Sequence, residues 1–288
     1  MILRDLLLVL ANQITMIRRC FKYGILVGIL LIGLVSCEPD GLKLPTDLYI
    51  TFSVVNEMTS PSDEPGNEDG NPNIPDNVPG LTVNGQKQNK SFYHRFAEGY
   101  FLTIDSASLR LRNIYFEGER QEGADYSFTS DFDEPLAIEF MKEKKDSVHF
   151  DVPQGQYQSI NVSIETDSLN NAQPGFTLKG KYNSANRGNI PLEFQFFDHP
   201  EIISLQVNKK KALTDTFIMK TGEKSYVEIQ LNLKHILEDM RGRRFEQCQT
   251  IEKNGKERIV ISNKLNTEIY NNVVGKTKEA FNATFYQL

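Results

Sequence analysis

The sequence predicts a mainly β protein: an antiparallel β-sandwich with a C-terminal helix, preceded by a cleaved signal peptide. Short segments that alternate apolar and polar residues recur from residue 46 onward, which is the pattern of strands that bury one face. Turn residues separate these segments, and the sequence contains neither a repeating β–α–β period nor a solenoid-type repeat. Such an arrangement favours two antiparallel sheets that bury their inner faces against each other.

Residues 1–36 have the features of a cleaved export signal. A basic region at residues 18–22 precedes an apolar run from Ile25 to Val35. This run is too short to cross a hydrocarbon core, which takes about 20 residues, but it has the length of a signal-peptide apolar region. Residues 1–15 are apolar and precede the basic region, so we expect translation to start at Met16.

Cys37 follows an aliphatic residue at position −3, Leu34, and a small residue at position −1, Ser36. This pattern resembles the lipobox of bacterial lipoproteins. The resemblance implies cleavage between Ser36 and Cys37 and attachment of lipid, including an acyl chain such as palmitate, at the Cys37 thiol. Two or three acyl chains anchor a protein stably where one is marginal. We therefore expect an outer-membrane lipoprotein, with its orientation to the periplasm or the cell surface left open; the alternative is an ordinary cleavage site that happens to hold a cysteine.

The expected domain organisation follows from the leader. Residues 37–45 are expected to form a tether and 46–288 a single β-sandwich domain, a length that can bury its own core. Residues 59–80 are rich in proline, glycine and acids and predict a long disordered loop. Within it, 67–73 alternates oxygen-bearing side chains as calcium loops do, but the glycine is misplaced for an EF-hand, so a solvated linker is favoured.

The strands expected in order are at 46–58, 99–119, 135–141, 147–153, 155–166, 175–182, 190–197, 202–207 and 224–233. The phase of the alternation changes after Leu111, which predicts a β-bulge near Asn113. The last strand is expected to turn helical near Lys234. Residues 263–283 show helical spacing of their apolar residues and predict the C-terminal helix.

Three segments, "SLRLRNIYFEG", "FDVPQGQYQSINVSIE" and the strand running into "LKHIL", resemble a group of bacterial lipoproteins with an uncharacterised prealbumin-like or immunoglobulin-like β-sandwich domain. In that group a Pro-x-Gly-x-Tyr turn precedes a central strand, and here these residues are Pro153, Gly155 and Tyr157. The likeness covers 46–240 and supplies no catalytic residues. We expect Tyr157 to pack the turn, like a tyrosine corner, rather than to contact a ligand.

Composition and motifs point away from several classes of function. The net charge of −6 makes nucleic acid an unexpected partner, because phosphate binding needs a basic face. The sequence has no G-x-S-x-G or S-x-x-K motif and no glycine-rich phosphate loop, so neither an enzyme nor a bound cofactor is expected. Cys248 follows two arginines, at 243 and 244, that would lower the pKa of its thiol. It is a candidate reactive thiol, with a partly buried strand position as the favoured interpretation.

The histidines predict no metal site. His94, His149, His199 and His235 are scattered, with no i, i+4 pair and no cysteine partner. Each is expected to have a structural role or to be solvated.

The expected function is a non-enzymatic envelope lipoprotein with a binding or accessory role, with a glycan or an envelope protein as partner. Tyr93, Tyr100, Tyr115 and Tyr126 would have to replace the missing tryptophan in a sugar-binding platform, although core packing is favoured for them. The alternative is a fimbrial or adhesin subunit assembled by β-strand addition, because the long loop would let strand 46–58 exchange. Against it, the tether and loop contain no arginine at which a protease could process the chain.

Overall fold

The computed structural model describes residues 44–55, 91–96, 100–130, 132–168, 173–184, 188–209 and 216–287. The helices and strands within these ranges all belong to one compact unit, Pro45–Leu288. The signal peptide, Ser36 and Cys37, most of the tether, and the acidic loop with its segment 67–73 lie outside the described residues. The interpretations of those segments therefore stay predictions.

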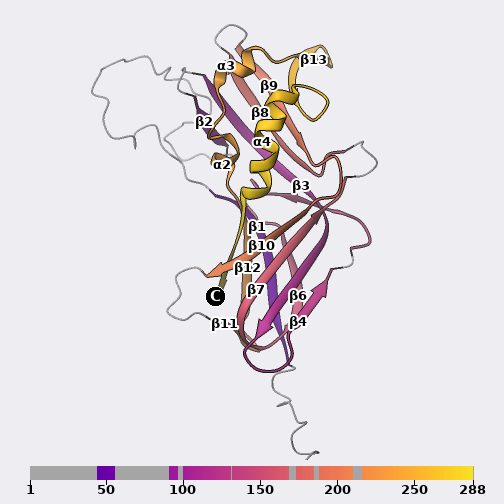
Figure 1. The fold of residues 1–288 in the computed structure, drawn as a ribbon, viewed down its shortest axis with the longest axis vertical. Helices are drawn as coiled ribbons and strands as arrows, with labels where there is room; N and C mark the ends of the chain where they lie inside the picture. Colours follow the sequence, from indigo (N-terminus) through magenta and orange to yellow (C-terminus); the bar gives the residue numbers. More distant parts are fainter. Residues whose placement is uncertain are drawn as a thin grey trace, which may run out of the picture. The chain divides into compact units, whose positions relative to one another are not determined.

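Fifteen strands and three helices make up the described part of the chain (Figure 1). In chain order they are β1 (Pro45–Val54), β2 (Phe92–Arg95), β3 (Phe101–Arg120), β4 (Tyr126–Thr129), β5 (Leu136–Glu139), β6 (Ser147–Pro153), β7 (Gly155–Thr166), β8 (Phe176–Ser184), β9 (Gly188–Phe196), β10 (Ile202–Lys209), β11 (Phe217–Met219), β12 (Lys224–Leu231), α2 (Leu233–Leu237), α3 (Gly242–Glu246), β13 (Thr250–Lys253), β14 (Lys256–Ile261), α4 (Thr267–Glu279) and β15 (Phe281–Gln287). The protein is mainly β, as the sequence predicts.

The strands form one large mixed sheet in the order β13-β14-β9-β8-β3-β7-β10-β15-β12-β1-β6, with β2, β4 and β5 paired to β3 and β11 paired to β7. Three pairings are parallel: β1 with β12, β10 with β15, and β14 with β9. The prediction of a purely antiparallel arrangement is therefore wrong. Alternation reveals that a segment is a strand with one buried face, but parallel partners are joined by long crossovers that leave no local pattern.

The long strand β3 connects the two parts of the sheet. Its first half pairs with β8 and its second half with β7. The register with β7 shifts between Leu111 and Asn113, which confirms the predicted bulge. Two further shifts were not predicted: one between Glu119 and Arg120, opposite β7, and one between Ile104 and Ser106, opposite β8.

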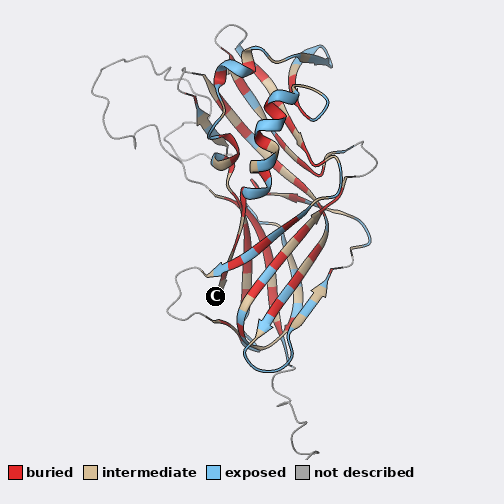
Figure 2. Cartoon of the chain, in the orientation of Figure 1, coloured by how far each residue is buried: buried red, intermediate tan, exposed pale blue. Residues whose placement is uncertain are grey.

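Inward-facing apolar residues of the strands form one hydrophobic core. Figure 2 shows buried and more exposed residues alternating along the strands. In β1, the alternate residues Leu48, Ile50 and Phe52 are fully buried, as their spacing predicts. Helix α4 covers part of the sheet, and its Tyr270 ring stacks on Phe196 of β9 with centroids 6.1 Å apart.

The C-terminal part differs from the prediction. Helix α4 ends at Glu279, and the residues that follow form β15, which inserts between β10 and β12. Alternate residues of β15 point into the core, so burial of a strand overrides the continuing helical spacing. Helix α3 and the hairpin of β13 and β14 were not predicted. Cys248 is partly buried, as expected, but it lies between α3 and β13 and not on a strand.

Candidate functional site

The Pro-x-Gly-x-Tyr turn is a structural corner. The fully buried Tyr157 donates a hydrogen bond from its hydroxyl to the carbonyl oxygen of Pro153, 2.6 Å away. Its ring packs on Gly118 of β3, where a Cβ atom would lie 2.6 Å from the ring. Burial raises the pKa of Tyr157 to about 12, so the hydroxyl keeps its proton and remains a donor. These contacts agree with the expected packing role.

The four tyrosines considered for sugar binding do not form a platform. They come from β2, the residue just before β3, the second half of β3, and β4. The Tyr115 hydroxyl donates to Glu165 at 2.5 Å, while Tyr100 and Tyr126 pack against the core. Tyr93 is 39% exposed on β2. The separate positions of the four rings, with Tyr100 and Tyr126 packed against the core, fit the packing interpretation better than a sugar site.

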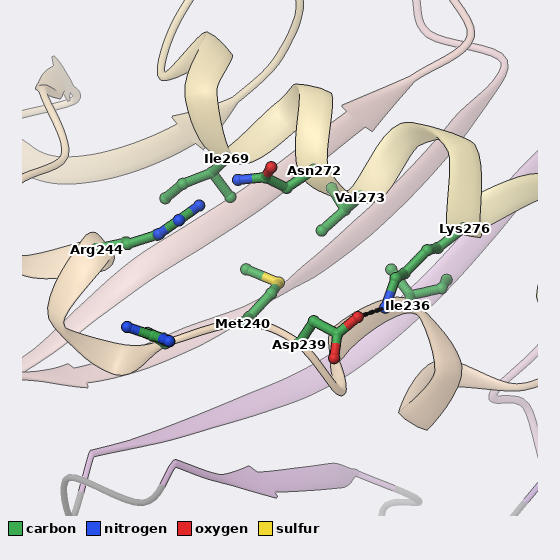
Figure 3. A pocket seen from close by; sticks show the side chains of 9 residues that line it. Ile236, Asp239, Met240, Arg244, Ile269, Asn272, Val273 and Lys276 are labelled. Carbon is green, nitrogen blue, oxygen red and sulfur yellow. Dashed lines mark hydrogen bonds and ion pairs between the residues drawn. The ribbon is translucent and has the colours of Figure 1, made fainter.

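A small cavity lies among α2, α3, the segment that joins them, and α4 (Figure 3). Ile236, Met240 and Val273 form its apolar side. At its rim, Lys276 forms ion pairs with Glu238, at 3.3 Å, and with Asp239. The volume of the cavity is about 20 Å³, which accommodates roughly one water molecule. The cavity therefore cannot enclose a substrate.

Cys248, the candidate reactive thiol, contacts Arg244, which lines this cavity. Cys248 Sγ donates a hydrogen bond to the carbonyl oxygen of Arg244, 3.5 Å away. A contact with a carbonyl oxygen stabilises the protonated thiol, whereas a nucleophilic cysteine needs groups that stabilise its thiolate. This contact gives no support to a reactive cysteine.

Three of the histidines occupy separate places. His94 packs on the ring of Phe96, and burial lowers its pKa, so it is neutral near pH 7. His199 Nε2 lies 3.7 Å from Asp198 on an exposed turn. His235, on α2, lies 3.1 Å from Glu238 through Nδ1.

His149 is the exception, because the fold brings it together with two carboxylates. In the described part of the chain, Asp47, His149 and Asp151 form a cluster whose ligand atoms all lie within 4.8 Å of one another. Asp47 of β1 lies directly opposite Asp151 of β6 in the antiparallel register. His149 is two residues from Asp151, so both side chains are on the same face of the sheet. His149 Nε2 is 2.7 Å from Asp47 Oδ1 and 3.7 Å from Asp151 Oδ1.

A row of aromatic rings orients His149 from one side. The His149 ring centroid lies 4.9 Å from that of Tyr49 on β1. Tyr226 of β12 stacks on Tyr49 at 5.3 Å, and Tyr286 of β15 stacks on Tyr226 at 5.1 Å. Nearly parallel rings at these distances are offset-stacked, so their faces contact one another. The row therefore restrains the imidazole and leaves few ring faces on which a sugar could stack.

Neither the cluster nor the aromatic row was predicted from the sequence. The His-x-Asp spacing of His149 and Asp151 places these two residues on one face of a strand, and this signal was readable in the sequence. Asp47 lies about a hundred residues earlier in the chain, and only the pairing of β1 with β6 brings it to them. The three stacked tyrosines likewise come from three strands whose adjacency has no local signature.

Comparison of the chain with protein-family models, with known proteins and with solved structures found no match. Among the described residues, none of the helices combines the length and the apolarity that a bilayer crossing requires.

Proposed function

We propose that this chain is a bacterial lipoprotein, anchored in the outer membrane through lipid on Cys37, and that the unit Pro45–Leu288 has a non-enzymatic binding or accessory role. The observation that carries the proposal is the leader: a basic region, a short apolar run and Leu34-Val35-Ser36 directly before the cysteine. The resemblance of the β-rich segments to an uncharacterised lipoprotein domain adds support. A glycan or an envelope protein is the proposed partner.

The proposed architecture of the unit is a sandwich of two packed layers. Aromatic contacts between strands that are not neighbours in the sheet support it. Phe176 of β8 packs edge-on against Phe281 of β15, with centroids 5.7 Å apart. Phe217 of β11 makes a perpendicular contact with Phe285 of β15 at 5.3 Å. In a two-layer fold, rings from opposite layers interdigitate in this way.

Metabolic labelling with a palmitate analogue tests the anchor. We expect the wild-type chain to take up label and the mature protein to begin at Cys37. Cys37→Ser should abolish the label and leave the leader uncleaved, while the matched leader variant Cys20→Ser should behave as wild type. Label retained by Cys37→Ser, or a mature N-terminus elsewhere, would contradict the proposal.

Two further measurements address the location and the partner. Protease treatment of intact cells separates the two orientations, since only a surface-facing chain is digested before lysis. Screening of the detergent-purified protein against envelope glycans, with photo-crosslinking in living cells, addresses the partner. A chain that shows neither a glycan ligand nor a crosslinked envelope protein would count against a binding role.

A fimbrial or adhesin subunit is the second candidate. Strand β1 supports it: β1 contributes buried Leu48, Ile50 and Phe52 to the core, and it lies between β12 and β6. A strand from another copy would have to satisfy both edges and refill that part of the core. SDS-resistant ladders of the chain isolated from cells would support this candidate, and a strict monomer would contradict it.

A further inference from the structure

We propose that Asp47, His149 and Asp151 bind one divalent transition-metal ion such as Zn²⁺ on the outer face of β1 and β6. This inference goes beyond the proposed function and does not depend on lipid attachment. It also departs from the sequence-based expectation that the chain has no metal site.

The carboxylates of Asp47 and Asp151 converge on a single nitrogen of His149. Both carboxylates approach Nε2 of His149, at 2.7 Å for Asp47 and 3.7 Å for Asp151. Ligand atoms about 2.1 Å from a tetrahedral zinc ion are about 3.4 Å from one another. The two distances bracket this value, so small side-chain rotations would place all three ligand atoms around one ion.

The other histidines show how specific this arrangement is. His235 also has two acidic neighbours, but Glu238 lies 3.1 Å from Nδ1 and Glu279 lies 3.5 Å from Nε2. Because these carboxylates flank opposite sides of the ring, no single ion can contact both of them and the imidazole. His199 has Asp198 as its acidic neighbour, at 3.7 Å.

The two aspartates of the cluster also place like charges side by side in the sheet. Asp47 and Asp151 occupy directly opposed positions on adjacent strands, where like charges destabilise a sheet. A bound cation would convert this repulsion into an attraction between β1 and β6. Lys224 is opposite Asp47 on the other side of β1, with its Nζ 5.7 Å from the centroid of the Tyr49 ring. Its positive charge offsets part of the negative field, so we expect a moderate affinity.

The donor set selects the class of ion. One imidazole with two carboxylates suits zinc and its neighbours in the first transition series better than calcium or magnesium, which prefer sites made of oxygen ligands alone. The side chains of His149, Asp47 and Asp151 are 45%, 43% and 71% exposed, so water can complete the coordination. The tilted contact with the Tyr49 ring, whose centroid lies 4.9 Å from that of the imidazole, limits rotation of His149 and so reduces the entropy lost on binding.

The test measures zinc binding by the full chain in detergent, in a Cys248→Ser background, by competition with a chromogenic chelator. We expect the parent to bind one zinc ion. Its affinity should fall about tenfold or more in Asp47→Asn, His149→Gln and Asp151→Asn, because the loss of a metal ligand, or of a group that supports one, typically has an effect of this size. His199→Gln removes an exposed histidine beside one carboxylate and should bind zinc as the parent does. Equal affinity in His149→Gln and His199→Gln, or no binding at millimolar zinc, would overturn the proposal.

Electron paramagnetic resonance with Cu²⁺ as the probe identifies the donor atoms independently of affinity. We expect nitrogen hyperfine coupling from one imidazole in the parent and in His199→Gln. That coupling should disappear in His149→Gln. If it persists in His149→Gln, the ion binds elsewhere and the proposed site is wrong.

Discussion

The two halves of β3 lie in regions of the sheet that are covered by different elements: helices around the first half and further strands around the second. Around the first half, β8 and β9 are covered by helices, with Tyr182 of β8 hydrogen-bonded to the Gly242 carbonyl oxygen of α3 at 3.0 Å and Tyr270 of α4 stacked on Phe196. Around the second half, the cover consists of further strands, joined by continuous backbone ladders through β7, β10, β15, β12 and β1. Helices α2 and α3 have five residues each, too few to be stable alone.

This difference has an energetic consequence. Helices that cover a sheet are attached to it by a few side-chain contacts. Strands are attached to their neighbours by many backbone hydrogen bonds, each of which contributes about the same stability. Substitutions at single side chains should therefore have larger effects in the helix-covered region than in the strand-covered region.

The largest effect is expected for a matched pair of glycine substitutions. A Cβ atom on Gly180 of β8 would lie 1.8 Å from the backbone oxygen of Thr103, while one on Gly118 would meet the Tyr157 ring at 2.6 Å. Backbone in a sheet cannot move aside as a ring can, so Gly180→Ala should lower the free energy of unfolding by about 3 kcal/mol and Gly118→Ala by about 1–2 kcal/mol. Urea denaturation measures both, and the reverse order would contradict the prediction.

High pH should destabilise the fold through buried tyrosines. Burial raises the pKa of Tyr157 to about 12 from an ordinary value near 10. Below pH 10, Tyr157 is protonated in both the folded and the unfolded state, so its ionisation does not reduce the free energy of unfolding. Between pH 10 and pH 12 the unfolded chain loses the proton first, so Tyr157 should reduce the free energy of unfolding by about 2–3 kcal/mol by the end of that range. Urea titrations at several pH values should show a shallower decline in Tyr157→Phe; an equal decline would contradict the prediction.

Removing one hydroxyl from each region gives a smaller effect. Tyr182 donates to the Gly242 carbonyl oxygen and is 3.0 Å from the Glu246 carboxylate, whereas Tyr157 donates to Pro153. Tyr182→Phe leaves a carboxylate and a carbonyl without this donor, so we expect a loss of about 2 kcal/mol, against about 1 kcal/mol for Tyr157→Phe. Hydrogen exchange should show α3 opening more readily in Tyr182→Phe alone. Similar exchange in both variants would argue against a weaker attachment of the helical cover.

The smallest predicted effect is a gain. Gly275 lies exposed in the middle of α4, and no atom would contact an added Cβ. Gly275→Ala should raise the free energy of unfolding by about 0.5–1 kcal/mol, because alanine loses less backbone entropy in a helix. Thermal denaturation measures the gain. A loss of stability would show that α4 has a contact requiring glycine at this position.

The sequence allowed most of the strands to be predicted, together with the bulge near Asn113 and the helical turn after β12. These features depend on neighbouring residues, and alternation or a change of its phase records them directly. The shortest elements, such as α3 and β11, escaped prediction because a few residues are too short to establish a period. The role of Tyr157 was also predictable, because its hydrogen bond spans one turn of the chain.

Local patterns of apolar and polar residues were enough to establish the strand-rich character of the chain and the inward faces of its strands. Local patterns also predict a leader that ends at Ser36, directly before Cys37. The tertiary structure was needed to show which strands pair, that three of the pairings are parallel, and that β15 follows α4. It alone brought Asp47 to His149 and Asp151. Strand pairing depends on how the apolar faces of segments far apart in the chain are buried together. No short stretch of sequence contains that information.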